Sequence, residues 1–252
     1  MMLVKDTPMI SFTKNKTALY EINGLPANIK AGCAGRAANN IDYLQDHEGV
    51  RFAEKKILSA ATGLHEKDIL SLEQIHGRDI LIVEEKPAAP CGIYGTADAM
   101  LTSLKEVCLV IRAADCVPVI LADKKSRAVG AVHSGWKGSR LGISGAAAAL
   151  MKERFGCSGD DLLACILPSI GPQSYEVKED VAQYFPEYTV RRGGSLFVDL
   201  WAAVTASLIA EGVPHENIFN CRICNLQNTD EFFSHRHGDT GRNLNYIFIT
   251  RL

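Results

Sequence analysis

The sequence predicts a mixed α+β or α/β fold: a single compact domain, residues 1–252, in which mixed β-sheets are flanked by helices. Short apolar runs bounded by turn residues recur through the first half of the chain. Three such runs follow one another closely in the centre, and three longer segments carry apolar residues at helical spacing and stop at a glycine. Because no linker, repeat or low-complexity segment interrupts the chain, we expect one domain.

The individual elements follow from the same patterns. In the first half, strands are expected near Met9–Phe12, Ala18–Ile22, Ile69–Leu72 and Ile80–Val83. The central runs CLVIRAA, VPVILAD and AVGAVH are apolar almost throughout, which is typical of strands buried on both faces. Further strands are expected in LLACILPSIGP and YIFITRL, and helices over 50–62, 142–155 and 199–211. The segment KPAAPCGIYG, with two prolines and two glycines, reads as a loop.

Composition excludes several classes of function. The formal net charge is −2, and no run of Lys and Arg is long enough to attract a polyanion, so nucleic acid is not expected as the main partner. No apolar segment approaches the roughly 20 residues that cross a bilayer, so no membrane association is expected. The N-terminus lacks a signal-peptide core, and eight cysteines are too sparse for a disulfide scaffold. We therefore expect reduced thiols and a cytoplasmic location.

Three reactive side chains each follow an apolar run and stand next to a turn residue. These are His76 in EQIHG, Cys116 in RAADCVP and His133 in AVHSGWKG. If the runs bearing Cys116 and His133 are adjacent parallel strands, both side chains leave the sheet at one edge. Two imidazoles and a thiolate suit zinc, and three protein ligands leave one position open, as in catalytic sites. From the residues alone, a Cys–His catalytic pair and ordinary core residues also remain open.

Six sequence motifs resemble, in their residues and in their order, those of the laccase-domain family, also described as YfiH-like or purine nucleoside phosphorylase-like. The motifs are QIHG, TADAMLT, AADCVPVILAD, AVHSGWKG, IGPQSYEV and FFSHRHGDTGR, and they extend from Gln74 to Arg242. The resemblance implies a YfiH-like fold and a zinc ion held by His76, Cys116 and His133. The chain departs from the family pattern at Lys137, where relatives usually have Arg, and at Gln173, where they often have Cys. AGCAGR echoes an early family motif only faintly, so no role is assigned to Arg36.

The resemblance also implies the chemistry. It points to phosphorolysis of adenosine, inosine, guanosine or methylthioadenosine and to deamination of adenosine, with purine nucleosides and inorganic phosphate as partners. Zinc would lower the pKa of a water, and a carboxylate would shuttle protons. Asp115 is the nearest candidate, although in an extended segment it would point away from Cys116, and it could instead hold a turn. Copper oxidation is disfavoured because a laccase needs many histidines and this chain has seven, so any copper would be adventitious.

Substrate contacts are expected from four residues. In SGWKG, small residues free backbone N–H groups, Ser134 supplies a hydroxyl and Lys137 a cation, which together could cradle phosphate. Arg242 could contact substrate or could pair with Asp98 or Asp115. Gln74, two residues before His76, completes the set.

Two other functions remain open. One is a metal-free hydrolase with Cys116 as nucleophile and His133 as base, and some relatives are linked to editing of peptidoglycan precursors. The other is a module that binds nucleoside or metal without turnover. The single C-x-x-C pair, Cys221 and Cys224, lacks a second pair and is interpreted as two partly buried thiols.

Overall fold

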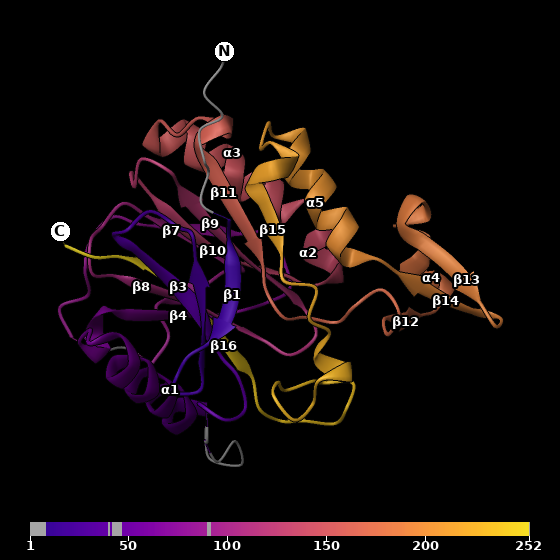
Figure 1. Ribbon diagram of the computed structural model, residues 1–252, viewed down its shortest axis with the longest axis horizontal. Helices are drawn as coiled ribbons and strands as arrows, with labels where there is room; N and C mark the ends of the chain where they lie inside the picture. Colours follow the sequence, from indigo (N-terminus) through magenta and orange to yellow (C-terminus); the bar gives the residue numbers. More distant parts are fainter. Residues whose placement is uncertain (1–8, 40, 42–46, 90–91, 252) are drawn as a thin grey trace.

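Two large β-sheets pack face to face, and helices cover the outer face of each (Figure 1). The computed structural model describes residues 9–39, 41, 47–89 and 92–251. Helix α1 (His47–Thr62) lies on one sheet, and α2 (Trp136–Arg140), α3 (Ile143–Phe155) and α5 (Leu200–Ala210) lie on the other. The predicted single domain of mixed sheets flanked by helices is confirmed.

The strand order shows how distant segments meet. The seven-stranded sheet runs β1 (Ser11–Lys14), β2 (Leu19–Asn23), β3 (Ile29–Ala34), β16 (Asn243–Ile249), β8 (Cys108–Ala113), β4 (Ile69–Glu73) and β6 (Gly95–Thr96). The six-stranded sheet runs β15 (Ile218–Asn220), β11 (Leu162–Ile166), β9 (Val117–Asp123), β10 (Val129–Ser134), β7 (Ala99–Thr102) and β5 (Ile80–Val83). Both sheets are mixed, because β4 pairs in parallel with β8 and β6, β5 with β7, and β11 with β15.

Central strand β9 shows why the middle of the sequence is so apolar. Ile120 packs between the two sheets, together with residues such as Ile111 of β8. Val119 and Leu121 face the other way, into the core shared with Met151 of α3. Both faces of the strand are therefore covered, and alternation of apolar and polar residues is lost.

The pairing of β9 with β10 corrects one expectation. The two strands are antiparallel, with His133 opposite Pro118, and not parallel. The reason is the connection, residues 124–128, which is long enough for a hairpin but not for the dozen or more residues that a parallel crossover needs. In an antiparallel pair the start of β9 and the end of β10 meet at one edge, so Cys116 and His133 are still brought together.

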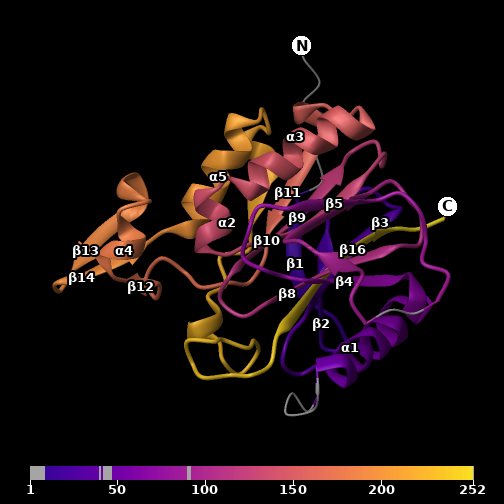
Figure 2. The same ribbon diagram turned by 180° about the vertical axis from the view of Figure 1, so that it is seen from behind.

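A small arm projects from the body of the molecule (Figures 1 and 2). It contains α4 (Glu179–Ala182) and the three-stranded sheet of β12 (Glu176–Val177), β14 (Ser195–Val198) and β13 (Thr189–Arg192). The patterns did not predict it, because its strands are short and exposed. The one local signal is the Gly193–Gly194 pair, whose positive φ angles close the hairpin.

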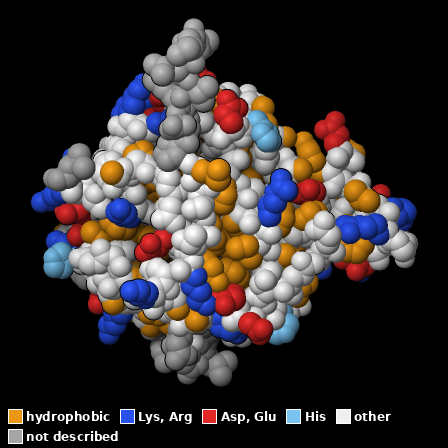
Figure 3. Space-filling view, in the orientation of Figure 1, with side chains coloured by type: hydrophobic (Ala, Val, Ile, Leu, Met, Phe, Trp, Pro, Cys, Tyr) orange, Lys and Arg blue, Asp and Glu red, His pale blue; other side chains and the backbone are white. Residues whose placement is uncertain are grey.

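The ends of the helices match their sequence signals. Gly142 and Gly156 flank α3 in the left-handed conformation, and the Asp199 carboxylate caps α5 by accepting a hydrogen bond from the backbone of Ala202 at 2.9 Å. Within the described residues, no helix combines the length and the apolarity that a bilayer crossing requires. Basic and acidic side chains are interspersed over the face drawn in Figure 3.

Candidate metal centre

His76, Cys116 and His133 converge between the two sheets. One ligand atom from each lies within 4.8 Å of the others. The two imidazole rings are 4.9 Å apart between centroids and nearly perpendicular. His133 comes from β10, Cys116 from the turn before β9, and His76 from the loop that follows β4 in the other sheet. The site thus depends on how the sheets pack as well as on one hairpin.

A buried carboxylate, Asp98, organises two of these three residues. It lies between β6 and β7, and its Oδ1 is 2.8 Å from His133 Nδ1. The same oxygen accepts from the His76 backbone N–H at 2.9 Å, and Oδ2 accepts from that of Gly77 at 2.6 Å. Burial raises the pKa of Asp98, but the bonds from His133 and Gly77 outweigh it and hold the pKa below its usual value. A carboxylate on Nδ1 leaves Nε2 of His133 for a metal.

Local backbone shape also serves the site. His76 has φ +59, a left-handed conformation that is uncommon for a non-glycine residue, and the Asp98 carboxylate fixes this turn through its two backbone bonds. Gly135 leaves room for the trio, since a Cβ there would lie 3.0 Å from Cys116 Sγ and 3.2 Å from the His76 ring. The sequence does not predict the left-handed backbone at His76, because that conformation is usually marked by a glycine. Nor does it predict the close packing at Gly135, whose φ of −68 is ordinary for any residue.

The electrostatics favour a thiolate. Burial raises the pKa of Cys116, but His133 and His76 more than offset this effect and bring the pKa to about 6. Burial lowers the pKa of His133, whereas the Cys116 thiolate and Asp98 raise it above its ordinary value. Without a metal, the pair therefore favours thiolate and imidazolium, and a cation among the ligands would replace that proton.

The donor set fits a borderline-soft metal ion. One thiolate and two imidazoles are characteristic zinc ligands, and the candidate ligand atoms lie within 4.8 Å of one another. Three protein ligands leave a position open, and His76 is exposed whereas His133 is buried, so that position can face solvent or substrate.

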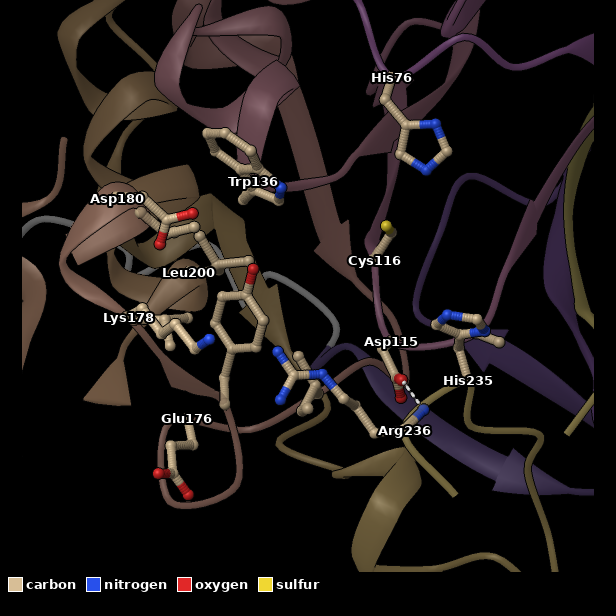
Figure 4. A pocket seen from close by; sticks show the side chains of 15 residues that line it. His76, Asp115, Cys116, Trp136, Glu176, Lys178, Asp180, Leu200, His235 and Arg236 are labelled. Atoms are coloured by element: carbon tan, nitrogen blue, oxygen red, sulfur yellow. Dashed lines mark hydrogen bonds between the residues drawn. The ribbon is translucent and has the colours of Figure 1, made fainter. Parts of the chain in front are cut away.

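Two members of the trio, His76 and Cys116, line a cavity of about 580 Å³, here called the main cavity. Figure 4 shows His76 and Cys116 on one side of it and Trp136, Asp180 and Lys178 on the other. The arm supplies the last two residues. This volume and a mixture of aromatic and charged side chains suit a small polar organic molecule.

Asp115 lies in the wall of the main cavity beside Cys116 (Figure 4). Its φ of +85 breaks the extended geometry that would have turned it away from Cys116. Oδ2 accepts a hydrogen bond from the Arg236 backbone at 2.8 Å, and the backbone carbonyl of Asp115 accepts one from Ile170. Its buried Oδ1 has no hydrogen-bond partner among the described residues.

A second cavity of about 340 Å³ also touches the trio, and it is here called the arginine cavity. Its wall includes Arg51, Arg112 and Arg242 together with His133. Predicted substrate residue Gln74 lies here too. Its side-chain amide accepts from the Arg112 backbone N–H at 2.9 Å and donates to the Arg112 carbonyl at 2.8 Å, so it joins the loop after β4 to β8.

The other predicted substrate residues lie in different places. Ser134 is fully buried, and its hydroxyl hydrogen-bonds that of Ser139 at 2.9 Å. Lys137 is exposed, with its ammonium 5.6 Å from the Trp136 ring centre. Neither lines the main cavity or the arginine cavity. Arg242 does line the arginine cavity, and its Nη1 donates to the carbonyls of Thr240 and Gly241.

Sequence reasoning missed the residues whose partners are far away in the chain. Asp98 was considered only as a partner for Arg242, although it is an acidic residue inside the apolar block TADAMLT. No sequence pattern indicated that Arg51, on α1, would lie at the site. The interpretation of Cys221 and Cys224 as two partly buried thiols is confirmed, since both are unpaired, one intermediate in exposure and one buried.

Two packed sheets bring a Cys–His₂ set with the spacing of a potential metal site to the edge of a cavity. The sequence model of the family described as "Multi-copper polyphenol oxidoreductase laccase" matches residues 36–250, and the chain belongs to this family. It is 34% identical to a "Purine nucleoside phosphorylase" of Bacteroides thetaiotaomicron over 96% of this chain and 99% of that protein. It is 27% identical to "Adenosine deaminase RL5" of an unknown prokaryotic organism over 90% and 92% of the two chains.

The fold is shared with a solved structure. The "hypothetical protein YfiH" of Bacillus licheniformis superposes with a TM-score of 0.84 at 26% identity, covering 95% of this chain and 99% of that one. The resemblance to the laccase-domain, YfiH-like family is therefore confirmed. Within the described residues one cluster, the trio itself, has metal-ligand spacing, and His65 and His215 are exposed away from it. A multicopper cluster needs more histidines than this.

Proposed function

We propose that the protein is a zinc-dependent purine nucleoside enzyme that carries out phosphorolysis of adenosine, inosine, guanosine or methylthioadenosine and deamination of adenosine. The observation that carries this proposal is the His76–Cys116–His133 trio, oriented by Asp98, with His76 and Cys116 in the wall of the main cavity. Zinc, when bound, supplies Lewis-acid chemistry and lowers the pKa of a water. The purine-specific names of two relatives support the substrate class.

The chain's own residues suggest how deamination proceeds. Asp115 holds an unpartnered Oδ1 beside the trio, where it accepts a proton from the attacking water. The water oxygen bonds to C6 of the purine, the proton passes to the departing amino group, and the C6–N bond breaks to give inosine and ammonia. Tyr175 and Arg236, whose guanidinium lies 5.4 Å from the Tyr175 ring centre, offer flat surfaces for the base.

The test is a product profile. Zinc-loaded protein is incubated with each purine nucleoside, with and without phosphate, and the products are separated by chromatography. Free base that forms only with phosphate reports phosphorolysis, and inosine from adenosine reports deamination. Both activities are expected to fall on chelation and return with zinc. Absence of either product from the zinc-loaded protein would contradict the proposal.

One observation favours a second candidate, a metal-free hydrolase. Cys116, His133 and Asp98 also have the order of a nucleophile, a base and an orienting carboxylate, and Cys116 has a lowered pKa. This mechanism makes the opposite demand on metal, because a zinc ion on the thiolate would block the nucleophile. Full activity of rigorously metal-free protein on a thioester or amide substrate, with inhibition by zinc, would favour it.

A further inference from the structure

The arginine cavity contains a buried guanidinium with incomplete pairing. Arg51 is 6% exposed. Its Nη2 donates to the Leu72 carbonyl at 3.2 Å and to Glu73 at 3.3 Å, whereas its buried Nη1 has no hydrogen-bond partner among the described residues. The nearest carboxylate oxygen of Glu54 is 3.9 Å from Nη1, too far for a hydrogen bond. A buried N–H of a cation that stays unbonded is costly, so an acceptor from outside the chain is expected here.

The charges around Arg51 favour an anion. Glu54 pairs with both Arg51 and Arg112, and Glu73 pairs with Arg51, so two carboxylates are shared between these guanidinium groups. Arg242 lines the same cavity. The side chain of Glu73 is 54% exposed, so its pairing with Arg51 is weak and can be displaced. Burial lowers the pKa of Arg51, and the neighbouring Arg112 cation lowers it further. The attraction of a bound anion would offset both effects.

The position of this cavity connects it with the candidate chemistry. It shares His76, Cys116 and His235 with the main cavity, so the two cavities meet at the trio. Their linings differ, because Trp136 and Tyr175 line the main cavity, whereas three guanidinium groups line this one. Arginine is the side chain best suited to hold phosphate oxygens, because its planar fork donates two parallel hydrogen bonds. About 340 Å³ is ample for one tetrahedral oxyanion with water.

We propose that the arginine cavity binds inorganic phosphate through Arg51, Arg112 and Arg242 and presents it to a nucleoside in the main cavity. This inference rests on the proposed function. A phosphate oxygen bonds to C1′ of the ribose while the C1′–N9 bond breaks. The electron pair goes to the purine, which takes up a proton, and the products are ribose 1-phosphate and the free base. The proposal thus assigns phosphate binding to residues that include Arg51 on α1 and Arg112 on β8, and not to the SGWKG segment that the sequence had suggested.

Direct binding tests the proposal without reference to turnover. Equilibrium dialysis of radiolabelled inorganic phosphate is compared for zinc-loaded wild type, Arg51→Gln and Arg112→Gln. Each substitution removes charge-assisted hydrogen bonds, so phosphate affinity is expected to fall roughly ten- to a hundredfold. Arg191→Gln is the matched control, because it removes the same charge from the exposed β13–β14 hairpin and should bind phosphate like wild type. Wild-type affinity in both cavity variants would overturn the proposal.

Folding and substrate identity are controlled separately. Arg51 is buried, so each variant is first checked by thermal unfolding, and Arg112→Gln, whose side chain is 18% exposed, provides the second test should Arg51→Gln unfold. In phosphorolysis, the loss in kcat/KM for phosphate should exceed the loss for the nucleoside by about tenfold. If the protein binds phosphate in an Arg51-dependent way but turns over no nucleoside, the cavity assignment stands and the proposed function fails. If adenosine 5′-monophosphate binds in this way and inorganic phosphate does not, the assignment to inorganic phosphate is wrong.

Discussion

Replacing Asp98 by Asn tests whether one buried carboxylate organises the metal centre. The side chain keeps its shape but loses its charge, and one acceptor oxygen becomes an NH₂ group. In the wild type, the Asp98 carboxylate accepts hydrogen bonds from His133, from the His76 backbone and from the Gly77 backbone. An amide cannot accept all three bonds, and its NH₂ would face an N–H donor. Either the His133 ring or the turn at His76 must therefore move.

The size of the effect follows from these contacts. Partners that orient a metal-bound histidine are typically worth ten- to a hundredfold in metal affinity, or about 1.4–2.7 kcal/mol. Loss of charge-assisted hydrogen bonds at a fully buried group should cost a further ~2–3 kcal/mol of folding stability, a decrease in Tm of about 5–10 °C for a chain of this length.

Zinc competition against a chromophoric chelator measures the affinity, and calorimetry measures the stability. Asp123→Asn is the matched control. Asp123 is equally buried, at the far end of β9, and its carboxylate accepts from Arg127 at 2.7 and 2.9 Å. The control should lose stability but keep its zinc affinity. Wild-type zinc affinity in Asp98→Asn, or an equal loss in Asp123→Asn, would refute the reasoning.

Three further predictions concern the trio and its neighbours. Gly135→Ala should lower zinc affinity by about tenfold or more in the same competition assay, because the new Cβ would lie 3.0 Å from Cys116 Sγ; unchanged affinity would argue against a crowded site. In zinc-free protein, the rate of Cys116 alkylation, followed by mass spectrometry, should rise through about pH 6 and then level off, because the thiolate forms above its lowered pKa. Bound zinc should protect Cys116 from alkylation. A rate that continues to rise past pH ~8 would show that the pKa of Cys116 is not lowered. Asp115→Asn should lower the rate of adenosine deamination by roughly 10²–10⁴ with little change in nucleoside affinity, measured by initial rates and calorimetry, and a wild-type rate would exclude Asp115 as the proton carrier.

Sequence patterns identified what is local in this fold. The central strands were visible because a strand covered on both faces must be apolar throughout, and α3 and α5 were visible because glycines close them. The edge at which Cys116 and His133 meet was predicted from a wrong premise, parallel strands. The prediction of the shared edge survived because the end of one hairpin strand is always close to the start of the other.

The remaining parts of the site depend on pairings that no local pattern records. Asp98 is 35 residues from His133 in the chain, and Arg51 is 61 positions before Arg112. A buried charge is stable only with a partner, but its sequence neighbourhood does not say which partner the fold will supply. Asp98 could have been suspected, because an acidic residue inside an apolar strand must find donors. Arg51 lies on an amphipathic helix, where a charged residue normally indicates a solvated face.

The meeting of two unlike cavities at the trio bears on which reactions the site can serve. A displacement at C1′ needs a nucleophile on one face of the carbon and a departing base on the other, so a phosphorylase must hold an anion and an aromatic base at once, in separate environments. A deaminase needs only the base and a water. Under the proposals made above, deamination uses only the main cavity with Asp115, whereas phosphorolysis uses both cavities. Damage to the arginine cavity should therefore shift the protein from phosphorolysis toward deamination. Damage at Asp98 should reduce both reactions, because His76 and Cys116 of the trio line both cavities.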